Sequence, residues 1–276
     1  MVSVQLQGRT VVVTGAGQGQ GAAEARLLVE AGARVVAADL GGAMPGELAA
    51  AIAAASAPGE SAPGELVYRQ LDVTDEAGWE RLAEWIRSQG WTVDGLVNNA
   101  GITQRSRLLD VSIADLQKVY DVNVAGALLG IQVLSPLMGS GASIVNVGSV
   151  AGLTAHYPVA YTASKWALRG LSQVAAMELG PRGIRVNTVH PGFIGTPMTA
   201  GATPQFREAT LAETPLGRTG STEEVAGVVL FLLSPLSSYV TGAEIPVDGG
   251  QSGHGGAKSV SDALRDAPFR EVSAVP

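Results

Sequence analysis

Residues 10–21 read TVVVTGAGQGQG, a short β-branched run that continues directly into a loop with four glycines. The segment that follows, AAEARLLVEAGA, has the composition of a helix. Glycines between a strand and a helix let a pyrophosphate approach the backbone, where its charge meets the positive end of the helix. A larger side chain at Gly15 or Gly19 would collide with the turn or with the phosphates. The stretch therefore indicates either a dinucleotide site or a tight turn that binds nothing.

An acidic residue, Asp39, ends the next β-branched run, 18 residues after Gly21. A carboxylate at this point can accept hydrogen bonds from both ribose hydroxyls of NAD, and it repels the 2′-phosphate of NADP. Gln18 in the loop is not basic, so it does not offset that repulsion. Asp39 can instead be a solvated loop acid, but its position favours NAD. Asp72 closes the following run, where it can either accept from the adenine amino group or cap the next helix.

Short apolar runs alternate with longer helical stretches along the chain. This pattern is typical of βαβ units, in which helices cover both faces of a parallel sheet. The expected strands are Thr10–Thr14, Arg34–Asp39, Glu65–Leu71, Gly95–Val97, Ser143–Val147, Ile184–Val189 and Glu244–Val247. The expected helices are 19–31, 76–89, 112–136, 160–180 and 222–233, and the expected N-caps are Asp75, Ser112 and Thr222.

We expect one dinucleotide-binding and catalytic domain over residues 1–252. Within it, residues 41–64 are rich in Ala, Gly and Pro, which indicates a helix flanked by a loose surface loop. Residues 253–276 follow the last strand and are short of apolar residues. They form either a mobile C-terminal tail or an arm at a subunit interface. We expect the tail, because chain ends are usually mobile unless they are tied down.

The composition argues against several classes of partner and site. The net charge is −7 and the 18 Lys and Arg residues are scattered, so we expect no nucleic-acid partner. No window has the roughly 18 consecutive apolar residues of a membrane span, so we expect no membrane partner. There is no cysteine, which excludes disulfides and zinc–thiolate sites, and we expect no metal. Because the first residues lack the pattern of a secretory signal, we expect a cytoplasmic protein.

A tyrosine and a lysine stand four residues apart in YTASK, so Tyr161 and Lys165 share one face of an expected helix. The unperturbed pKa of a tyrosine, about 10, is too high for a base near neutrality. A nearby ammonium and a positively charged nicotinamide both favour the phenolate and lower that pKa. Tyr161 can then take the proton of an alcohol as its hydride leaves, or protonate a ketone in reverse. Otherwise the pair is a buried tyrosine and a helix-surface lysine.

Other polar residues surround this pair in the sequence. Ser149 follows the strand SIVNV, where its hydroxyl can hold a substrate oxygen. Asn123 lies inside the expected helix 112–136, where it can bend the helix, bind water and supply a proton route behind Lys165, or be a satisfied core amide. Tyr157 is a weaker candidate base, because its fourth neighbour is Tyr161 and not a cation. Lys165 can also reach the nicotinamide ribose.

Together these motifs resemble the short-chain dehydrogenase/reductase family from about Leu6 to Gly250. The residues that carry the resemblance keep the family's order and spacing: Thr14-Gly15 with Gly19 and Gly21, Asn98-Asn99-Ala100-Gly101, Asn123, Ser149, Tyr161, Lys165 and Pro191-Gly192. The resemblance implies a single doubly wound Rossmann-type α/β domain, with a mainly parallel seven-stranded sheet flanked by helices, and usually a homotetramer. It also implies a catalytic tetrad of Asn123, Ser149, Tyr161 and Lys165, and a role for Asn98 in fixing the central strands.

The resemblance further implies the residues that contact NAD(H): Gly15, Gln18, Gly19, Gln20, Gly21, Asp39, Leu40, Asp72, Val73, Asn99, Ala100, Gly101, Tyr161, Lys165, Pro191, Gly192, Ile194 and Thr196. Of these, Ile194 and Thr196 match the family positions that contact the nicotinamide carboxamide. One departure from the family is Gly148, which replaces the serine that often precedes the catalytic one.

Stretches such as SKWALRGLS and SSYVTGAEIPVDGG are similar to bacterial NAD-dependent hydroxysteroid dehydrogenases. The implied substrate is a secondary alcohol or ketone, which we expect to be apolar. Its recognition is expected in the variable segments 195–215, 103–109 and 153–158. There, four apolar side chains either line a pocket under a mobile lid or simply pack helix faces: Phe193, Met198, Phe206 and Leu211. His156 and Tyr157 can reach the region of the substrate oxygen.

Three alternatives compete with this interpretation. The first is a nucleotide-sensing binding protein without catalysis, but such proteins commonly lack the tyrosine or the lysine, and both are present here. The second is an NADP-linked ketoreductase of a biosynthetic pathway. The third is an epimerase or dehydratase, whose larger substrate domain would not fit in 276 residues.

Overall fold

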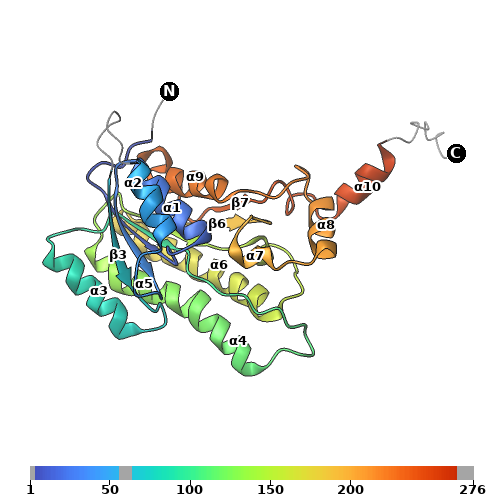
Figure 1. Ribbon diagram of the computed structural model, residues 1–276, viewed down its shortest axis with the longest axis horizontal. Helices are drawn as coiled ribbons and strands as arrows, with labels where there is room; N and C mark the ends of the chain where they lie inside the picture. Colours follow the sequence, from blue (N-terminus) through green and yellow to red (C-terminus); the bar gives the residue numbers. More distant parts are fainter. Residues whose placement is uncertain (1–3, 56–63, 266–276) are drawn as a thin grey trace.

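In the computed structural model, which describes residues 4–55 and 64–265, seven strands form one sheet in the order β3-β2-β1-β4-β5-β6-β7 (Figure 1). Every neighbouring pair is parallel. The strands are β1 (Thr10–Thr14), β2 (Arg34–Asp39), β3 (Glu65–Gln70), β4 (Gly95–Asn98), β5 (Ser143–Val147), β6 (Arg185–Pro191) and β7 (Glu244–Val247). The chain winds outward in opposite directions from β1 and from β4, which confirms the doubly wound α/β fold. In such a sheet, ligands bind beyond the carboxyl ends of the strands at this reversal point.

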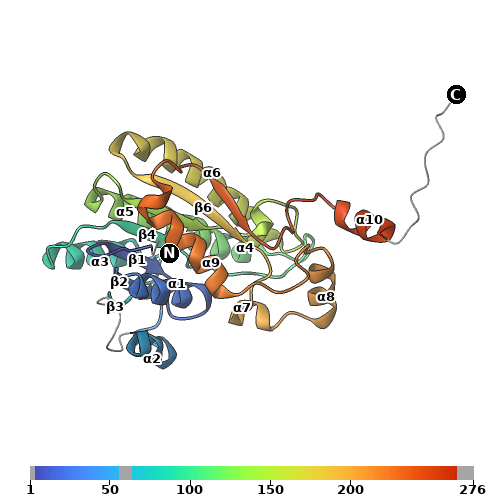
Figure 2. The same ribbon diagram turned by 90° about the horizontal axis from the view of Figure 1, so that it is seen from above.

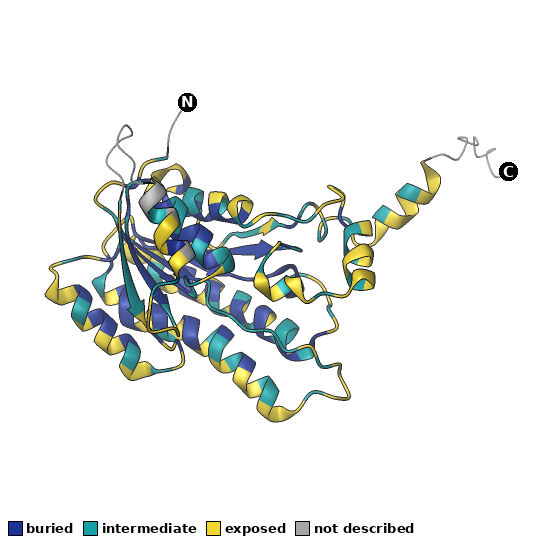
Figure 3. Cartoon of the chain, in the orientation of Figure 1, coloured by how far each residue is buried: buried dark blue, intermediate teal, exposed yellow. Residues whose placement is uncertain are grey.

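Helices cover both faces of the sheet (Figures 1 and 2). One face carries α1 (Gly19–Glu30), α2 (Gly46–Ala55) and α9 (Thr222–Leu233), and the other carries α3 (Glu76–Ser88), α4 (Ile113–Tyr120), α5 (Gly126–Leu134) and α6 (Val159–Leu179). Alternate side chains of one strand enter two different cores, because Val12 packs with Trp79 of α3 whereas Val13 packs with Leu28 of α1. The central strands are therefore buried on both sides (Figure 3).

The helix expected over 112–136 is confirmed as a continuous helical stretch, but its middle, Asp121–Ala125, is a π-helical segment between α4 and α5. Such widened turns are rare and are frequent at functional sites. The side chain of Asn123 bonds away from this segment, to the backbone of Ile102 and to Ser164. These bonds fix the wider turn, and the prediction that Asn123 disturbs the helix agrees with its position.

The helix caps agree only in part with the expectation. Ser112 caps α4, since its hydroxyl accepts from the Asp115 amide. Thr222 does not cap α9. Its neighbour Ser221 does, because the Ser221 hydroxyl accepts from the Glu224 amide while the Glu224 carboxylate accepts from the Ser221 amide, a reciprocal capping box. Asp75 is the N-cap residue of α3, as expected, and the backbone amides of Gly78 and Ala77 in the first turn lower the pKa of its carboxyl group, as does Arg81.

Three segments complete the chain around the site. The variable segment 195–215 contains two short helices, α7 (Pro197–Ala200) and α8 (Pro204–Ala212). Helix α2 confirms the helix expected within residues 41–64, whereas the loop expected beside it lies largely outside the described residues.

Beyond β7, α10 (Ala257–Leu264) projects from the body next to α8 (Figures 1 and 2). This helix was not expected, and residues 266–276 lie outside the described part of the chain.

Candidate active site

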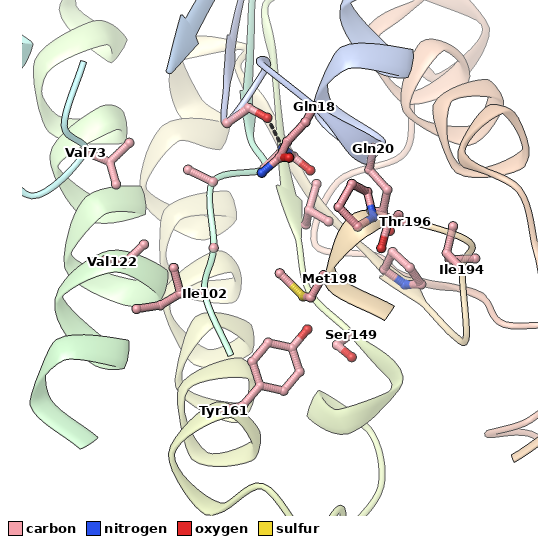
Figure 4. Close-up of a pocket in the computed structure, with 18 of the residues that line it drawn as sticks. Gln18, Gln20, Val73, Ile102, Val122, Ser149, Tyr161, Ile194, Thr196 and Met198 are labelled. Atoms are coloured by element: carbon pink, nitrogen blue, oxygen red, sulfur yellow. Dashed lines mark hydrogen bonds between the residues drawn. The ribbon is translucent and has the colours of Figure 1, made fainter. Parts of the chain in front are cut away.

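A cavity of about 410 Å³ lies beyond the carboxyl ends of β1, β2, β4, β5 and β6 (Figure 4). It brings together all the residues expected to contact the dinucleotide except Gly21, and it also includes Ser149. These residues are Gly15, Gln18, Gly19, Gln20, Asp39, Leu40, Asp72, Val73, Asn99, Ala100, Gly101, Tyr161, Lys165, Pro191, Gly192, Ile194 and Thr196. Ile102, Val122 and Met198 line the cavity too, although no motif singled them out for a dinucleotide.

The glycine loop packs closely against Ala100, two residues after the end of β4. Gly15 has a φ of +64°, and a Cβ there would lie 2.8 Å from Cα of Ala100. Gly21 does not line the cavity, because it packs α1 against the loop, where a Cβ would meet the Gly15 carbonyl at 2.2 Å. Gly19 has a φ of +57°, a conformation that side chains rarely adopt. These glycines leave the backbone open, so the cradle fits a pyrophosphate at the start of α1.

Polar side chains tie β1, which leads into this loop, to the end of β4, and tie β4 to β5. The Thr14 hydroxyl accepts from the amides of Asn99 and Ala100, each at 3.1 Å. The Asn99 side chain donates to the Thr14 carbonyl at 2.9 Å. One residue earlier, Asn98 donates to the Asn146 side chain at 2.8 Å and so joins β4 to β5. Asn98 is buried in the place expected for a residue that fixes the central strands.

At the far end of the cavity, Asp39 faces the glycine loop. Its Oδ2 accepts from the Gly17 amide at 2.8 Å, and its Oδ1 accepts from the Gly41 amide at 3.4 Å. Lys165 is the single Lys or Arg among the described residues that line the cavity. Asp72 also lines it, and its carboxylate accepts from the amide and the hydroxyl of Thr74. Asp72 therefore closes a local turn and does not cap α3.

At the opposite end, the Tyr161 hydroxyl points into the cavity beside Ser149 (Figure 4). Tyr161 stands in the first turns of α6, and Ser149 lies directly after β5, where its hydroxyl accepts from the Ala151 amide at 3.2 Å. Lys165 is buried, not a surface lysine, and its Nζ donates to the Val147 carbonyl at 2.7 Å. The Lys165 Nζ lies 5.7 Å from the centre of the Tyr161 ring.

Burial governs the acidity of both groups. It lowers the pKa of Lys165 to about 8. It raises the pKa of Tyr161 above its usual value, while the hydrogen bond with Ser149 acts in the opposite direction. In the protein without nucleotide, desolvation outweighs the other influences on the Tyr161 pKa. The lowering expected from Lys165 together with a bound nicotinamide stays a prediction.

Asn123 stands behind this group and does not line the cavity. Its Oδ1 accepts from the Ile102 amide at 2.9 Å, and its Nδ2 donates to the Ser164 hydroxyl at 3.0 Å. A Cβ at Gly101 would lie 3.3 Å from Asn123 Oδ1 and 3.6 Å from Lys165 Nζ. The two side chains thus converge on Gly101. The arrangement fits an amide that holds the segment next to Lys165, and a proton route through it stays a prediction.

A second cavity of about 250 Å³ adjoins the first and shares Ser149, Tyr161 and Met198 with it. Its wall includes His156, Tyr157, Phe193 and Phe206, all expected near the substrate. The Phe206 ring lies at the centre of this wall, 5.8 to 6.0 Å from the other three ring centres.

Leu211, expected to line this pocket, does not. Thr210 takes that place, because it follows Phe206 by four residues and so lies on the same face of α8. Sequence reasoning also missed Arg105 and Gln251 in the wall, and His190 behind Ser149. The clearest available signal was for Arg105, a charged residue inside a segment already expected to be variable.

Within residues 4–55 and 64–265, no helix has the length and apolar character needed to cross a membrane. The same residues contain no group of three or more His, Cys, Asp or Glu that could hold a metal ion.

Residues 15–252 match the family model described as Enoyl-(Acyl carrier protein) reductase. The chain is 38% identical over 255 residues to the trans-4-hydroxycyclohexanecarboxylate dehydrogenase of Sinomonas cyclohexanicum, a match that covers 91% of this chain and 95% of that protein. It is 38% identical over 256 residues to the 3-alpha-(or 20-beta)-hydroxysteroid dehydrogenase of Mycobacterium tuberculosis, covering 90% of this chain and 91% of that protein. The solved structure of the Pseudomonas aeruginosa RhlG/NADP active-site complex has a TM-score of 0.82 and 35% identity, over 91% of this chain and all of that one.

Proposed function

The chain belongs to the short-chain dehydrogenase/reductase family of oxidoreductases that act on alcohol- or ketone-type substrates, and we propose that it interconverts a secondary alcohol and its ketone with NAD(H), using Tyr161 as the acid/base. One observation carries the proposal. The hydroxyls of Tyr161 and Ser149 meet where the 410 Å³ cavity joins the 250 Å³ cavity. A carbon held at this junction can exchange a hydride with one side while its oxygen exchanges a proton with Tyr161.

Each residue at the junction has a distinct task. The Ser149 hydroxyl donates to the substrate oxygen and aligns it with the tyrosine. Tyr161 removes the hydroxyl proton in oxidation and returns it in reduction. When bound, nicotinamide supplies the hydride acceptor and a positive charge that favours the phenolate. Lys165 adds its own ammonium and can turn from the Val147 carbonyl toward the ribose, while Asn123 holds the backbone next to it.

The preference for NAD rests on Asp39. Its carboxylate stands at the cavity wall beside the Gly17 amide, 2.8 Å away, and no Lys or Arg among the described lining residues lies there to neutralise a 2′-phosphate. The RhlG complex holds NADP, and this observation favours a second candidate, an NADP-linked ketoreductase. The NAD-linked and NADP-linked candidates differ in whether the Asp39 carboxylate repels the 2′-phosphate of NADP.

For the substrate we propose an apolar alicyclic secondary alcohol. The aromatic wall around Phe206 supports this, because flat rings give a saturated ring a large contact surface. The names of the Sinomonas and Mycobacterium relatives both describe dehydrogenases of ring-bearing hydroxy compounds. Residues 1–252 would form the catalytic domain of a cytoplasmic homotetramer. Exposed apolar side chains such as Ile113 and Met177 give such an assembly surfaces to bury.

The test is a steady-state assay of the purified protein with alicyclic and open-chain secondary alcohols, each with NAD⁺ and with NADP⁺. We expect absorbance of NADH to appear with cyclic alcohols, and kcat/KM for NAD⁺ to exceed that for NADP⁺. Better use of NADP⁺ would favour the ketoreductase. Nucleotide binding without turnover of any alcohol or ketone would favour the sensing protein.

A further inference from the structure

The 250 Å³ cavity beside Tyr161 contains one permanently charged side chain, Arg105, among the described residues that line it. The remaining wall is aromatic, small or neutral, and it includes no Asp or Glu. Burial lowers the pKa of His156 and so disfavours the charged form of its ring. A guanidinium at the wall of an otherwise uncharged cavity leaves a positive potential that a ligand of opposite charge would neutralise.

Arg105 is held in place by backbone carbonyls and not by an acid. Its two terminal nitrogens donate to the carbonyls of Met198 at 2.8 Å and of Gly201 at 3.3 Å. These bonds use two of the five N–H donors of a guanidinium. The side chain is exposed, and no carboxylate of the described residues pairs with its charge. The side chain is therefore oriented by the backbone of residues 198–201, with donors to spare.

The protein carries 25 acidic residues against 18 basic ones, so carboxylates are available in excess. Six arginines and one lysine of the described chain form ion pairs: Arg26, Arg34, Arg81, Arg169, Arg218, Arg265 and Lys258. Arg105 forms none within the described residues. An arginine that is fixed, charged and unpaired at the substrate wall is thus available for a substrate group.

We propose that the substrate is an alicyclic alcohol that also carries a carboxylate, and that Arg105 binds this carboxylate while Ser149 and Tyr161 hold the hydroxyl. The inference rests on the proposed function and adds the chemical class of the substrate. The ring would lie against Phe206, between the two polar ends of the cavity. A planar guanidinium matches a carboxylate geometrically, which makes this pairing specific as well as strong.

An alternative occupant is a long acyl chain whose acidic carrier docks outside the cavity. It would place the negative charge beyond the wall, near arginines that do not line it. Arg207 is such a residue, with its guanidinium 5.8 Å from the centre of the Phe193 ring and outside the cavity lining. Arg105 and Arg207 therefore form a matched pair of variants, one inside the cavity wall and one behind it.

The experiment compares two probes with one ring, 4-hydroxycyclohexanecarboxylate and its methyl ester, in NAD⁺-linked oxidation. The ratio of kcat/KM for the acid to that for the ester is the readout. We expect the acid to be preferred by the wild type, and Arg105→Ala to lower the ratio roughly 10- to 100-fold, the size of a lost charge-assisted hydrogen bond. Arg105→Lys should restore part of it, and Arg207→Ala should leave it unchanged.

The ratio separates recognition of the carboxylate from support of the segment 198–201. If Arg105 only holds that segment, Arg105→Ala slows both probes equally, the ratio stays constant, and the inference is wrong. A ratio that falls with Arg207→Ala and not with Arg105→Ala would point to the external carrier instead. Inhibition of the wild type by cyclohexanecarboxylate but not by its amide is expected independently of any variant. If neutral cyclic alcohols turn over but acids do not, the proposed function stands and this inference fails.

Discussion

The imidazole of His190 occupies the space that a side chain at Gly148 would need. A Cβ at Gly148 would lie 2.7 Å from Nδ1 of His190, and that nitrogen is 3.0 Å from the carbonyl of Ser149. His190 is fully buried on β6, next to the end of β5. The departure from the family at Gly148 thus has a physical reason, because the missing side chain lets His190 hold the backbone of Ser149.

Gly148→Ala should therefore force His190 out of place. We expect a loss of stability of about 1–3 kcal/mol from overpacking and a lower kcat, because the Ser149 backbone loses its partner. Thermal unfolding and steady-state kinetics measure the two effects. Combining Gly148→Ala with His190→Ala should cost less than the sum of the single changes. Additive losses would mean that the two residues do not compete for the same space.

The charge of Asp39 is predicted to set the cofactor preference. Asp39→Asn keeps an oxygen that can accept from the Gly17 amide, and it removes the charge that repels a 2′-phosphate. We expect the kcat/KM ratio of NADP⁺ to NAD⁺ to rise roughly 10- to 100-fold, as for a hydrogen bond to a charged group. The measurement is a titration of both nucleotides at saturating alcohol. An unchanged ratio would show that Asp39 does not select the nucleotide.

Glu24 on α1 is fully buried, and neither carboxylate oxygen has a hydrogen-bond partner among the described residues. Burial raises its pKa from 4.5 to about 8. The folded state therefore binds the carboxyl proton of Glu24 more tightly than the unfolded state does. The stability that this proton contributes to folding is fully present below about pH 4.5 and is lost as pH rises to about 8.

Glu24→Gln should therefore stabilise the protein relative to the wild type at pH 8.5 more than at pH 5. In a domain of this size, each kcal/mol of added unfolding free energy should raise Tm by about 2–4 °C. Thermal melts at the two pH values measure it, with the exposed Glu80→Gln as the control. A Glu24→Gln effect that is equal at both pH values would contradict the assignment.

Lys165 is predicted to shift the pH profile of alcohol oxidation. Its ammonium favours the Tyr161 phenolate, so its removal in Lys165→Met should move the rising limb of kcat/KM to higher pH. The KM for NAD⁺ should rise as well, if the lysine binds the ribose. The test is to measure kcat/KM of the wild type and of Lys165→Met between pH 6 and pH 10. If the rising limb of the profile lies at the same pH in both, Lys165 has only a structural role.

The parallel sheet and the glycine loop followed from local sequence, and most of the other cleft residues followed from the resemblance to the family. β1 and the glycine loop carry their geometry in a single stretch, and the carboxyl ends of parallel strands must meet at one edge. Other features depended on contacts between distant residues. The π-helical turn at Asn123 arises from its bonds to Ile102 and Ser164, which lie 21 and 41 residues away. No local pattern encodes such a partner.

The acidity of Tyr161 was out of reach for the same reason. Its spacing from Lys165 was readable, but the burial that raises its pKa depends on the whole fold. In the substrate wall, the choice between Thr210 and Leu211 turned on which face of α8 meets the cavity. The segment 103–109 was expected near the substrate, but the place of Arg105 in the wall was not, because its side chain is held by the carbonyls of Met198 in α7 and of Gly201 after it.

The most direct test of the account is Tyr161→Phe, which removes the single hydroxyl that exchanges the proton. Calorimetric titration with NAD⁺ and assay of the same preparation with a turned-over alcohol give both quantities. We predict nucleotide binding within about threefold of the wild type, and a kcat lower by at least the roughly 10²–10⁴-fold that an acid/base contributes. Wild-type turnover by the Tyr161→Phe variant would contradict the assignment of Tyr161 and with it the proposed mechanism.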